Sequence, residues 1–256
     1  MFLWLTSVCS VVIYAPLAFG LVWLQRPHVG WLQLGFIAGT ALLHTVYFLL
    51  LARGYRFGDL SLVYPLARGT GPLITIAGAM LILHERPSQV ALAGAAMVAI
   101  GVFLLTGDPH RLRTSGSRGA VLFALLTGTS IAAYSVWDKV AVATVMIPPL
   151  LLDWAGNLMR MGMLTPVAVR SGIPAAAAWK SHRRDILGVA VLSPLAYILV
   201  LTAMVYTPVS YVAPAREISI LVAAVMGTHF LGEGSGGRRM LAAAVMVLGV
   251  TALALG

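Results

Sequence analysis

Two arginines and one glutamate stand well inside long apolar segments of the sequence. Arg68 lies in one segment, and the adjacent Arg216 and Glu217 lie in another. Charged side chains are costly in hydrocarbon, so each is a candidate functional residue. Arginine binds carboxylate and phosphate groups well. The two arginines therefore have two interpretations. They could line a cavity for an anionic solute, or they could be structural and bind Glu217 and the backbone carbonyls that lose their amide partner at nearby prolines.

Glu217 is also the candidate coupling residue. Burial penalises the charged form of a carboxylate, so a carboxylate within a membrane can take up a proton near neutral pH. We therefore expect any proton coupling to run through Glu217. The alternative is a plain salt bridge from Glu217 to Arg68 or Arg216.

Other polar side chains inside apolar segments complete the candidate substrate-binding set. Asn157 and Arg160 lie three residues apart, as do His44 and Tyr47, so each pair shares a helix face. Instead of binding substrate, His44 could be a hydrogen-bonded packing residue. Trp137 and its neighbours Asp138 and Lys139 could instead lie at the membrane interface. The predicted set is Arg68, Arg216, Glu217, Tyr64, Tyr211, Trp137, Asn157, Arg160, His44 and Tyr47.

These residues must be positioned by membrane-spanning helices. The chain has 256 residues, of which 60% are hydrophobic and only 10% charged, too few charges to cover a water-facing surface. Apolar runs long enough to cross a bilayer as helices predict an all-α polytopic bundle. We expect nine spans, near residues 2–24, 31–52, 60–83, 88–106, 119–137, 148–169, 186–206, 210–231 and 239–256.

The sequence favours no enzyme class, cofactor or metal site. Cys9 is the one cysteine, and there is no nucleotide-binding loop, zinc-protease motif or serine-hydrolase motif. The net charge of +9 comes from short loops and not from a basic patch with interleaved aromatics, which argues against nucleic acid. One alternating set of loops holds eleven cations and the other three, which predicts a cytoplasmic N-terminus and an external C-terminus.

The chain repeats itself. Arg68 aligns with Arg216, Glu85 with Glu233 and Gly101 with Gly249, each pair 148 residues apart, and we expect both glutamates to be structural. The alignment predicts a first repeat at 1–106, a linker at 107–118 and a second repeat at 119–256. Repeats with odd numbers of helices insert with opposite orientations, which is a basis for alternating access around a central cavity.

The stretches GDLSLVYPLARGTGPL, HERPS and SYVAPAREISILVAAVMGTHFLGE resemble the EamA-type transporters of the drug/metabolite transporter superfamily. The resemblance covers nearly the whole chain and implies ten helices, of which the first is missing here, whereas the matching part of the second repeat is present as AYSVWDK. It implies a secondary transporter of the bacterial inner membrane, a monomer or homodimer in the lipid bilayer that carries a small solute. The two arginines favour an anionic or zwitterionic metabolite. The alternatives are efflux of cationic drugs and an intramembrane enzyme that acts on a lipid-linked substrate.

Overall fold

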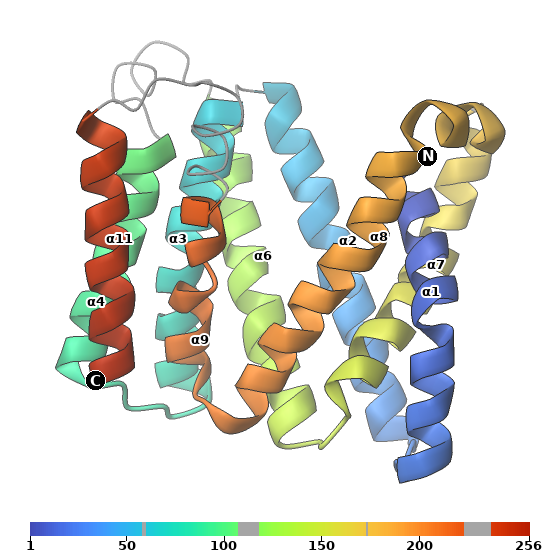
Figure 1. Ribbon diagram of the computed structural model, residues 1–256, viewed down its shortest axis with the longest axis horizontal. Coiled ribbons are helices and arrows are strands. Elements are labelled where there is room, and N and C mark those ends of the chain that lie inside the picture. Colours follow the sequence, from blue (N-terminus) through green and yellow to red (C-terminus); the bar gives the residue numbers. More distant parts are fainter. Residues whose placement is uncertain (58–59, 107–117, 173, 223–236) are drawn as a thin grey trace. The chain divides into compact units, whose positions relative to one another are not determined.

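The computed structural model describes residues 1–57, 60–106, 118–172, 174–222 and 237–256, and all regular secondary structure in these ranges is helical. The predicted linker at 107–118, except Arg118, and the predicted glutamate Glu233 lie outside the described residues. The helices are α1 (Phe2–Gln25), α2 (Trp31–Phe57), α3 (Leu60–Ile82), α4 (Gln89–Thr106), α6 (Arg118–Ala143), α7 (Pro149–Arg170), α8 (Ala175–Tyr206), α9 (Val209–Ala215) and α11 (Gly237–Leu255) (Figure 1).

Several helices extend beyond the apolar runs that predicted them. Helix α2 continues to Phe57, α6 continues to Ala143, and α8 begins at Ala175 and bends at His182, whose backbone is not helical. Hydropathy marks the part of a helix that can lie in hydrocarbon, while the backbone can stay helical through the polar residues that follow. The predicted spans at 31–52, 119–137 and 186–206 are therefore correct as elements but too short, while the span at 210–231 is described only as far as residue 222.

The described helices have the character of membrane spans. Helices α1, α2, α6 and α8 are long and apolar enough to cross a bilayer, and shorter apolar helices occur at 66–82, 89–104 and 240–255. Large apolar side chains such as Trp23, Leu24 and Val169 are exposed on the surface of the protein. Lipid can cover such a surface, whereas water cannot without a large free-energy cost. The chain is an integral membrane protein.

The described residues form two compact units. Unit 1 contains Met1–Thr45 and Trp137–Tyr206, and unit 2 contains Val46–Val136 and Thr207–Gly256. Each unit combines a part of the first predicted repeat with a part of the second.

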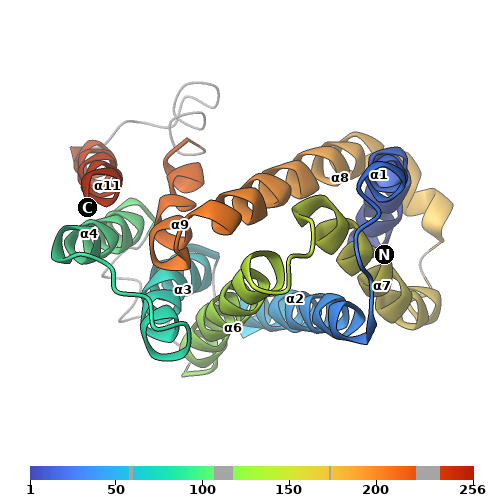
Figure 2. The ribbon, with the colours of Figure 1, turned by 90° about the horizontal axis from the view of Figure 1, so that it is seen from below.

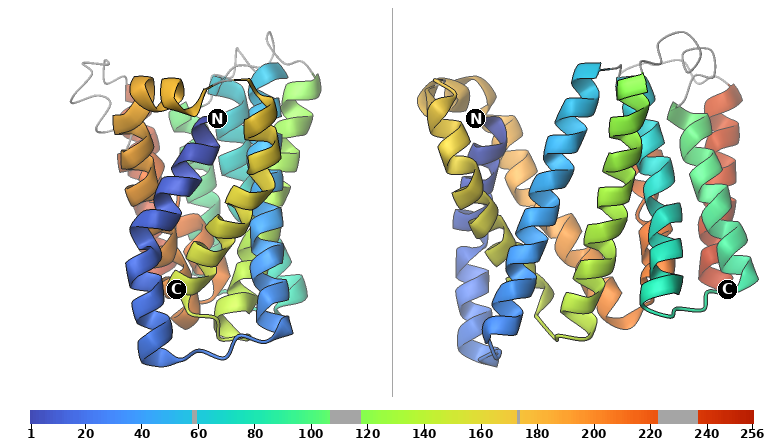
Figure 3. Two further views of the ribbon diagram at one scale, coloured as in Figure 1. Left: turned by 90° about the vertical axis from the view of Figure 1, so that its right-hand side faces the viewer. Right: turned by 180° about the vertical axis from the view of Figure 1, so that it is seen from behind.

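In unit 1, helix α1 packs against α7 and α8 (Figures 2 and 3). Polar side chains on these helices bond to backbone carbonyls of their neighbours. Tyr14 donates its hydroxyl to Val191 O at 2.6 Å, and Trp154 donates its indole N–H to Val11 O at 3.0 Å. Such bonds satisfy polar groups that have no access to water within a bilayer.

In unit 2, helices α4 and α11 lie side by side and run in opposite directions (Figures 1 and 2). Two glycines permit their close approach. A Cβ atom at Gly101 would overlap the side chain of Met246, and a Cβ atom at Gly249 would lie 2.9 Å from the backbone nitrogen of Val98. The predicted repeat pairs Gly101 with Gly249 and Val98 with Met246. The two contacts are therefore copies of each other, as inverted repeats related by a pseudo-two-fold axis require.

Candidate functional site

Unit 2 contains a buried cluster of three charged residues, which we call the arginine cluster: Arg68, Arg216 and Glu217. Arg68 Nε lies 3.0 Å from Glu217 Oε2, and Arg216 Nε lies 3.6 Å from Glu217 Oε1. The side chain of Glu217 is 1% exposed, while those of Arg68 and Arg216 are 17% and 10% exposed. One carboxylate thus forms ion pairs with two guanidinium groups, and the three residues together carry a formal charge of +1.

A break in the helix positions two of these residues. Helix α9 follows Pro208, contains Pro214 and ends at Ala215, and residues 218–222 are helical again. At the break the N–H of Glu217 bonds to Pro214 O at 3.0 Å, a tighter turn than that of an α-helix. We expected a span at 210–231 with an irregular segment beside Arg216, and the break lies there. Pro214 lacks the amide that would bond to the carbonyl of Ser210 and crowds the turn before it, which destabilises the short helix α9 next to the break.

Aromatic rings face both arginines. The Arg68 guanidinium lies 5.8 Å from the centroid of the Tyr64 ring, and the Arg216 guanidinium lies 5.7 Å from that of Tyr134. Both distances permit cation–π attraction, which is stronger away from water. The Tyr47 ring in turn contacts Tyr134 edge-on, with 5.7 Å between centroids.

The structure therefore brings together five of the predicted site residues: Arg68, Arg216, Glu217, Tyr64 and, through Tyr134, Tyr47. Sequence reasoning missed Tyr134, although it lies in the stretch AYSVWDK that was predicted to match the family. It also missed Ser219, whose hydroxyl oxygen accepts a hydrogen bond from Arg68 Nη2 at 3.4 Å.

Tyr211 has a different role in unit 2. Its hydroxyl donates to Gly256 O and accepts from the Ser88 N–H, both at 3.3 Å. Nearby, both carboxylate oxygens of Glu85 accept hydrogen bonds at 2.9 Å, from the N–H groups of Val209 and Ser210. These are the first amides of α9, which have no partner within the helix. Glu85 is structural, as predicted.

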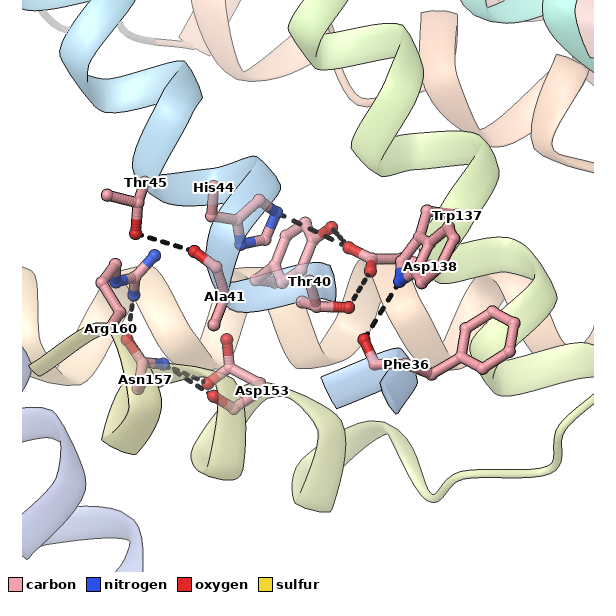
Figure 4. Close-up of polar contacts among 11 residues, drawn as sticks. Phe36, Thr40, Ala41, His44, Thr45, Trp137, Asp138, Asp153, Asn157 and Arg160 are labelled. Carbon is pink, nitrogen blue, oxygen red and sulfur yellow. Dashed lines mark hydrogen bonds and ion pairs between the residues drawn. The ribbon is translucent and has the colours of Figure 1, made fainter. Parts of the chain in front are cut away.

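Unit 1 contains a second buried polar group, centred on Asp138 of α6 (Figure 4). Asp138 is completely buried. Its Oδ1 accepts a hydrogen bond from the Thr40 hydroxyl at 2.5 Å, and its Oδ2 accepts one from the Tyr197 hydroxyl at 2.6 Å. His44 Nε2 lies 3.5 Å from Oδ2. The predicted residue His44 thus contacts a buried carboxylate, which agrees with the alternative of a packing residue that has a polar partner.

Trp137 holds the adjacent residue Asp138 in place. Its indole N–H donates to Phe36 O at 3.0 Å, and its ring lies 4.5 Å from the Phe36 ring between centroids. The indole also occupies the space beside Gly39, where any larger residue would overlap it. Trp137 is therefore a positioning residue in unit 1.

Helix α7 contributes a row of three polar side chains to unit 1 (Figure 4). The Asn157 amide nitrogen donates to Asp153 Oδ2 at 2.9 Å, and Arg160 Nη2 donates to the Asn157 amide oxygen. Asn157 thereby links a buried carboxylate to a guanidinium. Sequence reasoning missed Asp153 because it lies near the start of its span, but its spacing of four residues from Asn157 was a usable signal.

The fold and the two buried polar groups define a polytopic helical membrane protein with ionisable side chains inside its spans, which is typical of proteins that move solutes. The chain belongs to the EamA-like transporter family, whose sequence pattern matches residues 1–107 and 118–255. It is accordingly a membrane transporter of small molecules, in a family of transporters rather than enzymes.

Comparison with curated proteins and with solved structures supports the fold and gives no further information on function. A search of curated proteins found no match. A solved structure described only as the crystal structure of a protein resembles this chain with a TM-score of 0.75 at 15% sequence identity. The alignment covers 98% of this chain and 88% of the solved one.

Proposed function

We propose that the protein is a secondary transporter of a small anionic or zwitterionic metabolite, and that the solute's acidic group binds at the arginine cluster. The observation that carries this proposal is the sharing of one carboxylate by Arg68 and Arg216. A guanidinium group offers several N–H donors in a fixed plane. One carboxylate balances the charge of only one guanidinium group, so the cluster keeps a net positive charge that attracts a solute carboxylate or phosphate.

The tyrosine rings support the same proposal. Tyr64 and Tyr134 stack near the guanidinium groups and restrict their orientations, which lowers the entropy lost when a solute binds. The rings also offer apolar surface to the uncharged part of a metabolite. A cationic drug would meet two guanidinium groups before it reached Glu217, so the cluster disfavours the efflux alternative.

Alternating access supplies the transport cycle in this proposal. We propose that residues 1–106 and 119–256 are the two inverted repeats, and that exchange of their conformations opens the site to each side in turn. The two separate stretches that match the family, and the copied glycine contacts of α4 and α11, support this division. The proposed location is the bacterial inner membrane.

Glu217 remains the first candidate for proton coupling in this proposal. Its two guanidinium neighbours stabilise the carboxylate. A solute anion that took over one of these arginines would weaken that stabilisation, so solute binding and protonation of Glu217 would then favour each other.

The proposal is tested first by thermal unfolding of the purified protein with inorganic phosphate, succinate, alanine and tetraphenylphosphonium as probes. A probe that binds the folded protein raises its unfolding temperature. We expect stabilisation by an anion or a zwitterion, lost in Arg68→Ala and in Arg216→Ala but kept in Arg86→Ala, whose arginine is an exposed loop residue.

Uptake of the stabilising compound into proteoliposomes then tests transport itself. We expect uptake to fall at least about tenfold in each cluster variant, since a lost charged hydrogen bond costs about 1.5–3 kcal/mol. Stabilisation by tetraphenylphosphonium alone, or normal uptake by both cluster variants, would contradict the proposal.

A further inference from the structure

Asp138 in unit 1 has the surroundings of a carboxyl group that can change its protonation state in place. Its two oxygens accept hydrogen bonds from the hydroxyls of Thr40 and Tyr197, and His44 lies beside Oδ2. A hydroxyl can donate a hydrogen bond or accept one, and an imidazole nitrogen can do either according to its protonation. These neighbours therefore satisfy both the charged and the neutral form of Asp138 without rearrangement of the helices.

Glu217 in unit 2 has different surroundings. The guanidinium groups of Arg68 and Arg216 lie 3.0 and 3.6 Å from its oxygens. A guanidinium only donates hydrogen bonds and stays charged, so it suits the carboxylate form alone. Protonation of Glu217 would leave two buried cations facing a neutral group, whereas protonation of Asp138 faces no such requirement from Thr40 and Tyr197.

Two cations of unit 1 that lie in α6 and α7, Lys139 and Arg160, have hydrogen-bond acceptors other than Asp138. On α6, Lys139 Nζ donates to Met204 O at 2.6 Å. On α7, Arg160 donates to Asn157, which donates to Asp153. Asp153 is thus a second carboxyl group of unit 1 with a hydrogen-bond partner of its own.

We propose that Asp138 and His44 form a proton-binding site in unit 1. This inference rests on the proposed transport function and adds a proton site outside the arginine cluster, one that binds a proton with no solute present, whereas Glu217 would take one up only when a solute displaces an arginine. In the exchange step a proton leaves Nε2 of the His44 imidazolium and binds Oδ2 of Asp138, which leaves both residues neutral. Tyr197 then turns its hydroxyl from donor to acceptor.

Infrared titration of the purified protein in lipid nanodiscs tests the site with no solute present. A buried protonated carboxyl group has its own C=O stretching band, which disappears as the group ionises. We expect this band to titrate in the wild type, to be lost in Asp138→Asn, and to persist in Glu217→Gln and in the control Asp185→Asn, whose carboxylate is exposed. His44→Gln should move the midpoint by about one pH unit or more, because a neighbouring titratable group would be lost.

Two further variants keep the test decisive if Asp138→Asn fails to fold. Asp138→Glu should keep a titrating band with a changed midpoint, and Tyr197→Phe should also change the midpoint because it removes one hydrogen bond to Oδ2. Absence of a titrating band in the wild type, or its loss in Glu217→Gln rather than in Asp138→Asn, would overturn the proposal. Because no solute is used, that failure would leave the proposed binding of an anion at Arg68 and Arg216 standing.

Discussion

At the scale of single residues, the energetics of unit 2 depend on Glu217. This carboxylate is 1% exposed and forms ion pairs with both Arg68 and Arg216. Two guanidinium groups in a site of low dielectric constant repel each other unless a negative charge lies between them. Glu217 is therefore needed for stability as well as being a candidate for function.

Glu217→Gln should destabilise the folded protein strongly. The variant keeps the shape of the side chain but leaves two buried cations without their carboxylate, and such a loss costs about 3–5 kcal/mol. We expect a lower unfolding temperature in the absence of solute, measured by thermal unfolding in detergent. Adding Arg216→Met to Glu217→Gln should recover part of the loss, because the mutual repulsion disappears. Equal stability of Glu217→Gln and the wild type would contradict this account of the cluster.

At the scale of elements, packing of α4 on α11 depends on the absence of side chains at two points. Membrane helices gain little from the hydrophobic effect when they associate, since lipid is as apolar as their side chains. Close backbone contact and good packing provide the attraction instead. Gly249 and Gly94 illustrate this, because a Cβ atom at Gly249 would lie 2.7 Å from the carbonyl oxygen of Gly94.

Alanine should therefore have opposite effects at two helical glycines. In Gly249→Ala the new methyl group meets backbone atoms of α4, which cannot move without separating the helices, and overpacking of this kind costs about 1–3 kcal/mol. In Gly188→Ala nothing lies within 4 Å of the new Cβ, and alanine is the better helix former by about 1 kcal/mol. Thermal unfolding should rank Gly188→Ala at or above the wild type and Gly249→Ala below it. The reverse order would show that α4 and α11 do not pack as described.

At the scale of the whole molecule, the distribution of cations sets the orientation in the membrane. Eleven cations belong to one alternating set of loops and helix ends and three to the other. Lys139, one of the three, lies inside α6 and bonds to a backbone carbonyl, so the poorer set of loops has fewer cations than the sequence suggested. Cytoplasmic loops are enriched in lysine and arginine. We therefore expect Arg53, Arg56 and Arg170 to lie on the cytoplasmic side.

A fluorescent reporter that is active only in the cytoplasm tests this orientation. We expect no signal when it is fused after Gly256 and a strong signal when it is inserted after Ser171, at the end of α7. The insertion is the control for expression and membrane delivery. A strong signal after Gly256 together with a weak signal after Ser171 would mean that the orientation is reversed.

The sequence by itself determined the class of fold and the most prominent charged residues. Apolar runs separated by charges and prolines are a local property, so they predicted the helices, and an arginine inside such a run was recognisable without any tertiary contact. The fixed spacing between Arg68 and Arg216 likewise predicted the repeat. The same information could not give the ends of the helices, because the backbone stays helical beyond the hydrophobic part of each span.

The tertiary structure decided which polar residues work together. Asp138 follows Trp137 at what seemed the end of a span, and only the packing of α2, α6 and α8 brings Thr40, His44 and Tyr197 to it. Tyr211 shows the reverse case, a plausible site residue whose hydroxyl contacts backbone groups of other segments instead. Helical periodicity assigns a side chain to a face, but the partner on the facing helix depends on rotation and crossing of helices that are distant in sequence.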